Sequence, residues 1–208
     1  MDAVRNNAEW CDTVCRAQGI ETRFGDHAWV ALSRSPMFYP DAVTLTRSAT
    51  AEEVLRDIDT SPGCSIKDSF ANLDFSPYGF RVLFDAEWIY LPAPERTSDP
   101  VWSVVFDAAD FAAWDTGAVF SPALLDDANV TFLLGGKEHR AGVIANRTEA
   151  VVGLSNLTGD ADWPTAVQSI ADRYPGLPIV GYETGDDLAA AQEIGFTTIG
   201  PLRVWVKE

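Results

Sequence analysis

The sequence predicts an α+β protein of three layers, with a mixed, mostly antiparallel sheet flanked by helices. The main observation is the order of apolar runs and capped segments after residue 140, which reads strand, strand, helix, strand, helix, strand. A second is an amphipathic helix predicted over residues 3–18 and ended by Gly19. The composition agrees with a packed core, because 47% of the residues are hydrophobic and 11% are aromatic.

The first half has fewer regular patterns. Thr50 and Glu53 form a capping box, which predicts a helix to about residue 58. Residues 21–40 are aromatic-rich and predict irregular structure, and residues 65–73 are ambiguous. The strands predicted here are 42–46, and then 79–84 and 87–91 as a pair.

The second half is more regular. Asp162 is the expected N-cap of a helix that reaches about residue 174. A short helix is predicted over 108–114, and another runs from 184 to Gly195. The strands predicted here are 102–106, 130–135, 140–146, 150–156, 177–183 and 198–206. Prolines 92, 94 and 100 indicate a linker, so we expect one domain over 1–208, with an N-terminal half 1–91 and a C-terminal half 101–208.

The charge balance limits the partners. With 15 basic and 31 acidic residues the net charge is −16, which argues against nucleic acid and against an anionic membrane as partners. No apolar run reaches the roughly 18 residues of a membrane span, and the start has no apolar signal core. Three cysteines without a signal favour a reducing, cytoplasmic setting, and two histidines give no support for a metal site.

Residues 140–206 resemble the second half of the GNAT (acyl-CoA N-acyltransferase) fold. The features that carry the likeness are a strand hairpin, a helix, the short apolar strand 178–183, a helix ended by Gly195-Phe196, and the final strand 201–206. The glycine lets the chain turn with positive φ, and the phenylalanine enters the core. The first half is compatible with the same fold, or with a degenerate second copy of it.

This resemblance implies an enzyme that moves an acyl group from a thioester to the amino group of a small molecule, and a protein that forms a homo- or heterodimer. Glu183, at the end of an apolar strand, is the expected proton acceptor, with Tyr182 beside it as a candidate proton donor. Ser155 and Asn156 end the strand that lies against the acyl group in the family, and they could bind a substrate carbonyl or amide. The alternative for Asn156 is a turn residue that closes the strand.

The resemblance also implies acetyl-CoA or another acyl-CoA as cofactor, with its pyrophosphate held at a helix start. The matching segment begins with Leu157, Thr158 and Gly159. It departs from the family pattern Gln/Arg-x-x-Gly-x-Gly/Ala, because it has one glycine and no Gln or Arg, and because Pro164 removes an N–H donor. From residue 148 to the end there are nine acidic and three basic residues, the wrong sign for phosphate. Where many family members have a tyrosine to protonate the thiolate, this chain has Ala191.

Other residues are candidates for substrate binding. Lys67 and Asp68 suggest a paired site, or alternatively a surface ion pair. Arg147 could hold a carboxylate through two hydrogen bonds, or simply occupy a hairpin turn. Trp29 and Tyr39 could line a pocket, or pack in the core.

Three functions follow for testing. The first is acyl transfer with Glu183 as base. The second is a GNAT-fold enzyme that no longer uses CoA and performs elimination, cyclisation or proton transfer on a small amino compound. The third is a non-catalytic partner subunit with an aromatic interface. A fold alone does not choose between them.

Overall fold

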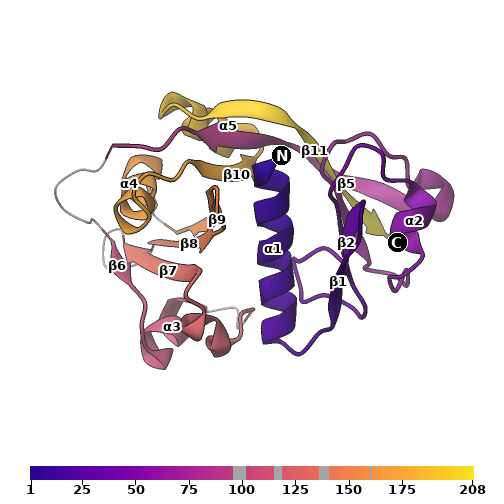
Figure 1. The fold of residues 1–208 in the computed structure, drawn as a ribbon, viewed down its shortest axis with the longest axis horizontal. Helices are drawn as coiled ribbons and strands as arrows, with labels where there is room; N and C mark the ends of the chain where they lie inside the picture. The colour runs from indigo at the N-terminus through magenta and orange to yellow at the C-terminus, as the bar shows by residue number, and fades with distance from the viewer. Residues whose placement is uncertain (96–101, 115–118, 136–140, 160) are drawn as a thin grey trace. The chain divides into compact units, whose positions relative to one another are not determined.

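The structure is a computed structural model, and it describes residues 1–95, 102–114, 119–135, 141–159 and 161–208 (Figure 1). By its internal contacts the chain divides into two compact units. Unit 1 is Ala3–Glu87 with Gly200–Glu208, and unit 2 is Trp88–Ile199. The last residues of the chain therefore complete the first unit.

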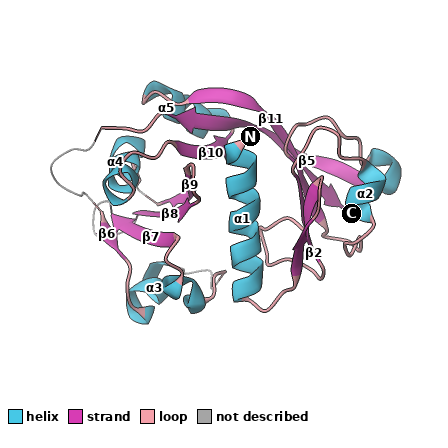
Figure 2. Cartoon of the chain, viewed as in Figure 1, coloured by secondary structure: helices cyan, strands magenta, loops and turns pink. Residues whose placement is uncertain are grey.

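The described residues contain both helices and strands (Figure 2). The helices are α1 (Asp2–Ala17), α2 (Ala51–Leu55), α3 (Ala108–Trp114), α4 (Trp163–Arg173) and α5 (Gly185–Glu193), with short 3-10 helices η1 (Ser76–Tyr78) and η2 (Pro122–Asp126). The strands are β1 (Thr22–Phe24), β2 (Ala28–Ala31), β3 (Ala42–Thr44), β4 (Ser65–Asp68), β5 (Phe80–Leu91), β6 (Ser103–Val104), β7 (Val130–Gly135), β8 (Ala141–Arg147), β9 (Val152–Thr158), β10 (Ile179–Glu183) and β11 (Thr197–Lys207).

Unit 1 has a sheet in the order β1-β2-β3-β4-β11-β5, in which β3 and β4 pair in parallel, whereas β1–β2, β2–β3 and β4–β11 pair antiparallel. Successive residues of a strand point to opposite faces, so each face has its own core. Trp29 and Val43 pack against Cys11 and Cys15 of α1 on one face. On the other face the core includes Val54 of α2, with Val30, Ala42, Ile66, Phe75, Phe80 and Trp205.

Unit 2 has a sheet in the order β5-β10-β9-β8-β7-β6, with β9 and β10 paired in parallel. Ile170 and Ala166 of α4 lie in the core on one face, together with Val143, Val152 and Ile179. The other face carries aromatic rings of α3 and β7, of which Phe111 and Phe132 pack edge to face at 4.9 Å. Both units thus have a sheet between helices, and the predicted α+β fold with a mixed, mostly antiparallel sheet is confirmed.

Several predicted elements differ from the observed ones. Residues 79–84 and 87–91, predicted as a strand pair, form the single strand β5, because Asp85 and Ala86 between them continue the extended strand. The segment 21–40 contains the hairpin of β1 and β2, which the prediction of irregular structure missed. The helix after Thr50 ends at Leu55, although its capping box is present as predicted. Pro100 and His139 lie outside the described residues.

In each unit two neighbouring strands pair in parallel over two residue pairs and then separate. In unit 1 the pairs are Ala42 with Ile66 and Val43 with Lys67. Beyond them, side chains join the strands, since the Ser69 N–H donates to Thr44 Oγ1 at 2.8 Å. The gap in unit 1 is therefore bridged by the protein's own atoms.

Asp68 completes this bridge. Its carboxylate is fully buried and accepts the backbone N–H groups of Phe70 and Leu73, the latter at 2.8 Å. Burial raises the pKa of Asp68, and these hydrogen bonds oppose the rise. Asp68 thus provides hydrogen-bond acceptors for backbone N–H groups of the loop that follows β4.

The Thr44→Val variant tests the bridge. It replaces the acceptor of the buried Ser69 N–H by a methyl group, so the free energy of unfolding should fall by about 1–3 kcal/mol in chemical denaturation. Thr60→Val, the same substitution at an exposed site, should change it by less than about 0.5 kcal/mol. Equal effects at the two positions would contradict the bridge.

Candidate active site

The gap between β9 and β10 lies entirely in unit 2 and is the candidate site. Val152 pairs in parallel with Ile179, and Gly153 with Val180. After these pairs β9 continues along β8, and β10 lies beside β5. The strands part because β9 bends at an irregularity in its pairing with β8.

β9 contains a bulge. Between the pairs Ile144–Ser155 and Gly142–Thr158, β9 has one residue more than β8. Asn156 lies in this stretch with φ of 54°, the left-handed conformation that asparagine tolerates better than most residues. A bulge bends its strand and re-aims the side chains around it. The alternative prediction that Asn156 closes the strand is wrong, because β9 continues to Thr158, although its left-handed backbone is typical of a turn residue.

Gly181 lies at the point where the strands part. A Cβ at this position would be 3.0 Å from the carbonyl oxygen of Leu154 and 3.7 Å from Cγ1 of Ile89. A side chain would therefore press on the backbone of β9. Glycine keeps β10 close to β9 here, just before Tyr182 and Glu183.

The candidate side chains face opposite sides of the sheet. Leu154 packs in the core under α4, so the adjacent Ser155 faces the other side. Tyr182 packs edge to face on Trp88, with ring centroids 5.6 Å apart. Ile89, the neighbour of Trp88, lies in the α4 core, so Tyr182 and Ser155 share the face away from α4, and Glu183 faces α4 and α5.

Ser155 has a buried hydroxyl oxygen with no hydrogen-bond partner among the described residues. Such groups are rare in folded proteins, because an unsatisfied buried polar atom costs free energy. A hydroxyl in this state beside a gap between strands is suited to bind a polar atom of a ligand.

Glu183 is the titratable group at the end of β10. Burial, and secondarily the negative charge of Asp187 in the first turn of α5, raise its pKa from 4.5 to about 7. The carboxyl group can therefore accept or release a proton near neutral pH, which is the property required of a general acid–base group.

The N-terminus of α4 is where a phosphate group would be expected to bind, because helix N-termini offer free N–H groups. Here Asp162 is the N-cap, and its Oδ1 accepts the Thr165 N–H at 3.2 Å. Its Oδ2 accepts the Thr165 hydroxyl at 2.6 Å. Leu157 is packed against the α4 core, Thr158 ends β9, and Gly159 turns the chain with φ of 72°.

The remaining candidate residues lie elsewhere. Arg147 is exposed and donates to Asn129 Oδ1 at 2.9 Å, at the end of the β8 strand. Lys67 and Asp68 belong to unit 1 and, as neighbours on a strand, point to opposite faces. Both are buried, and Lys67 Nζ donates to Asn7 Oδ1 at 2.7 Å, so the alternative of a surface ion pair is wrong.

Trp29 and Tyr39 also belong to unit 1. Trp29 is fully buried, and its indole N–H donates to Asp12 Oδ1 at 2.9 Å. Tyr39 is half-buried and packs edge to face on Trp10 at 6.2 Å. These contacts match core packing for Trp29.

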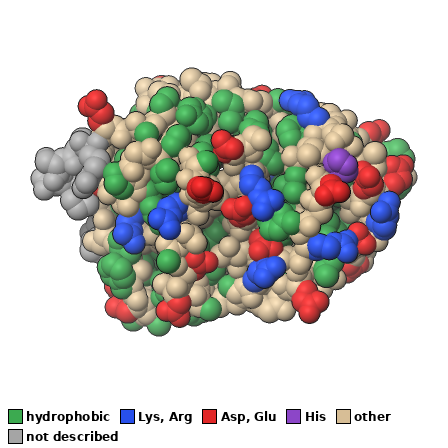
Figure 3. Space-filling view, viewed as in Figure 1, with side chains coloured by type: hydrophobic (Ala, Val, Ile, Leu, Met, Phe, Trp, Pro, Cys, Tyr) green, Lys and Arg blue, Asp and Glu red, His purple; other side chains and the backbone are tan. Residues whose placement is uncertain are grey.

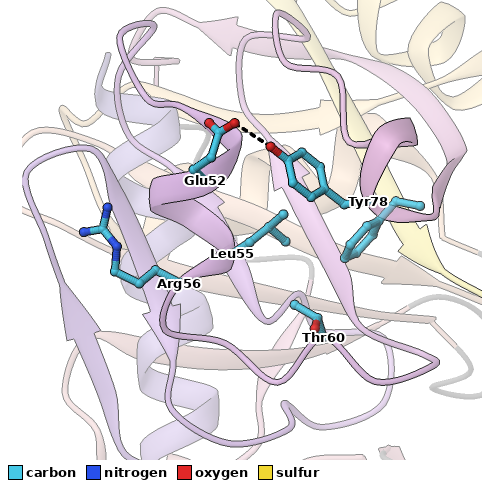
Figure 4. Close-up of a pocket in the computed structure, with 6 residues that line it drawn as sticks. Glu52, Leu55, Arg56, Thr60 and Tyr78 are labelled. Carbon is cyan, nitrogen blue, oxygen red and sulfur yellow. Dashed lines mark hydrogen bonds between the residues drawn. The ribbon is translucent and has the colours of Figure 1, made fainter.

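Unit 1 also has a cavity of about 450 Å³ lined by residues of α2, η1 and the start of β5 (Figure 4). Figure 4 shows Glu52 and Tyr78 joined across its edge, the tyrosine hydroxyl donating to the carboxylate. This bond is the main reason that the pKa of Glu52 is lowered. Glu52 is therefore a poor proton acceptor near pH 7, and chemistry favours the β9–β10 gap over this cavity.

Charge is intermixed on the face in Figure 3, where acidic and basic side chains alternate instead of gathering by sign. Among the described residues no group of three or more histidine, cysteine or acidic side chains is placed to hold a metal ion. In the same residues, none of the helices combines the length and apolar character needed to cross a bilayer.

Sequence reasoning missed two features of the site. The bulge in β9 arises from pairing with β8, and its only signal in the sequence was an asparagine within a strand. Asp187 contributes to the raised pKa of Glu183 from four residues further along the chain. That spacing was readable, but it could not show that the two carboxylates approach across a strand end and a helix start.

Comparison with solved structures identifies the fold. A GCN5-related N-acetyltransferase from Kribbella flavida matches with a TM-score of 0.60 and 13% identity, over 99% of this chain and 95% of that one. A functionally unknown conserved protein from Staphylococcus epidermidis matches with a TM-score of 0.60 and 10% identity, over 91% and 94%. A GCN5-related N-acetyltransferase from Sphaerobacter thermophilus matches with a TM-score of 0.52 and 9% identity, over 98% and 91%.

These likenesses establish the GNAT fold for this chain. They extend over nearly the whole length of both partners in each case. No protein-family model and no curated protein matches the sequence.

The raised pKa of Glu183 predicts how stability depends on pH. The protonated carboxyl suits its surroundings, so its stabilising contribution is complete below pH 4.5 and is lost as pH rises through about 7. Glu183→Gln should therefore be more stable than the wild type by about 2 kcal/mol at pH 8.5, and nearly equal to it at pH 5.

Denaturant unfolding at both pH values measures this difference. Glu193→Gln, an exposed position on α5, is the matched control and should show no such pH dependence. A constant difference between Glu183→Gln and wild type across pH would refute the raised pKa.

Proposed function

We propose that the protein is an N-acyltransferase that moves an acyl group from a thioester to the amino group of a small molecule. The observation that carries the proposal is a carboxyl group with a pKa of about 7 at the end of β10, where β9 and β10 part. The GNAT fold supports it, because solved structures described as N-acetyltransferases share that fold.

Glu183 would supply the proton transfer. Attack of the amine nitrogen on the thioester carbonyl forms a C–N bond, breaks the C–S bond, and leaves a proton on nitrogen that must be removed. An ionised Glu183 accepts this proton, directly or through a water molecule. The proton ultimately goes to the departing sulfur, which regenerates the carboxylate. A pKa near 7 permits Glu183 both to take up the proton and to release it.

Ser155 and Tyr182 would orient the reactants. They share one face beside the gap, and Ser155 has an unused buried hydroxyl that can donate to a carbonyl oxygen. Tyr182 is fixed by its packing on Trp88, so its hydroxyl holds a defined position. Holding amine and thioester in a reactive orientation accounts for much of the rate in such a reaction.

Acyl-CoA is the donor that the fold suggests, and its nucleotide part does not fit the start of α4. The start of α4 does not fit a pyrophosphate, because Asp162 occupies the Thr165 N–H and Pro164 has none to give. We therefore assign no step to the nucleotide part of CoA.

A second function is favoured by the same observation. A GNAT-fold enzyme without CoA would retain Glu183 as a proton-transfer group and act on a small amino compound by elimination or cyclisation. Turnover of such a compound with no thioester present would identify this function.

The primary test supplies an acetyl thioester and a panel of primary amines, including amino acids, polyamines and aminoglycosides. Acetyl transfer is measured by the free thiol that is released. The rate constant kcat/KM should rise with pH and reach half its maximum near pH 7, as Glu183 ionises. Glu183→Gln should lower kcat about 100-fold or more and abolish this inflection, whereas Glu193→Gln should retain both. An unchanged profile in Glu183→Gln would exclude it as the base.

Ser155→Ala distinguishes binding from structure. Removal of an unsatisfied buried hydroxyl should leave the free energy of unfolding unchanged or raise it by up to about 1 kcal/mol. The KM for the substrate that Ser155 binds should nevertheless rise about tenfold. A clear loss of stability with an unchanged KM would show that the serine has only a structural role.

A further inference from the structure

We infer that the acyl donor is recognised without its nucleotide, so that this protein takes thioesters of the pantetheine type and gains nothing from the 3′-phospho-ADP of CoA. The inference rests on the proposed function and on the contacts at the start of α4. It names the chemical class of the donor, a neutral thioester with no phosphate group required.

The first step is the supply of N–H donors. An α-helix leaves four N–H groups at its N-terminus without intrahelical partners, and these groups bind anions. In α4 the second helical position is Pro164, which has no N–H, and the third N–H, that of Thr165, is held by the Asp162 side chain. The N–H of Ala166 donates to the Asp162 carbonyl oxygen. Of the four N–H groups expected at this helix start, Pro164 supplies none and that of Thr165 is held, which leaves those of Asp162 and Trp163.

The second step is charge. The Asp162 carboxylate itself occupies the place of a bound anion, so a phosphate would meet a negative charge there. This carboxylate is tied by two bonds to Thr165, whose hydroxyl also accepts the Trp102 indole N–H at 3.1 Å. The cap is therefore fixed in place, and it would not swing aside without breaking these bonds.

The third step is the lack of a compensating cation on this helix. Arg173 is the basic residue of α4, and it belongs to the last turn, about 15 Å from the first turn by the helical rise. Its guanidinium lies over the Tyr174 ring, 5.6 Å from the centroid. The helix thus offers no arginine or lysine to a phosphate at its start.

The experiment compares acetyl-CoA with acetyl-pantetheine and S-acetyl-N-acetylcysteamine as donors to the same amine. The kcat/KM values of acetyl-CoA and acetyl-pantetheine should agree within about threefold. A preference for acetyl-CoA of about tenfold or more would overturn the inference.

A binding measurement separates this inference from the proposed function. Calorimetry with 3′,5′-ADP at about 5 mM should give no binding to the wild type, whether or not any thioester is turned over. A dissociation constant below about 1 mM for 3′,5′-ADP would overturn the inference even if acyl transfer were demonstrated. If no donor acylates any amine, the proposed function fails, while an absence of 3′,5′-ADP binding would still support the reading of α4.

Variants test the two residues directly. Asp162→Ala with Pro164→Ala frees one N–H, restores another and removes the charge, so affinity for 3′,5′-ADP should become measurable and rise at least about tenfold. Asp172→Asn, near the other end of α4, removes the same charge without opening the helix start and should gain nothing. No gain in a double variant that circular dichroism finds folded would refute the assignment to Asp162 and Pro164.

Discussion

The site in unit 2 depends on one constraint, the need of β9 to satisfy its hydrogen bonds with β8 while it starts in parallel with β10. The extra residue near Asn156 bends β9, so the strand cannot remain paired with both neighbours. A gap follows, and the two strands present side chains to it in place of a hydrogen-bond ladder. Ser155 lies beside that gap with an unused buried hydroxyl, and Glu183 ends β10 with a pKa that burial and Asp187 raise to about 7.

Unit 1 contains a similar separation of parallel strands, but a hydrogen bond closes it. Its parallel strands β3 and β4 also part after two pairs, but Thr44 bridges them and buried Asp68 satisfies the following loop. In unit 2 the position after the last pair on β10 is Gly181, which keeps β10 close to the Leu154 carbonyl oxygen of β9, and the buried hydroxyl of Ser155 has no partner among the described residues. A shared strand arrangement therefore gives a sealed core in one unit and a candidate active site in the other.

The electrostatics of unit 2 separate proton transfer from anion binding. Asp187 lies near Glu183 and adds to the effect of burial, which keeps a proton available near pH 7. Asp162 meanwhile caps α4 and satisfies the group that could otherwise bind phosphate. Acidic residues at both helix starts thus fit a site for an amine and a neutral thioester better than a site for a nucleotide.

The sequence by itself determined the elements whose cause is local. The capping groups Thr50 and Asp162 and the apolar periodicity of α1 and α4 depend on residues within a turn or two, so these helices were predictable. The placement of Glu183 at the end of a strand was also readable. Only the tertiary structure decided that 80–91 is one strand. It also decided that Lys67 and Asp68 are buried in unit 1, whereas Glu183 belongs to unit 2. It also decided where β9 leaves β10, because strand pairing, bulges and burial arise from contacts between residues distant in sequence.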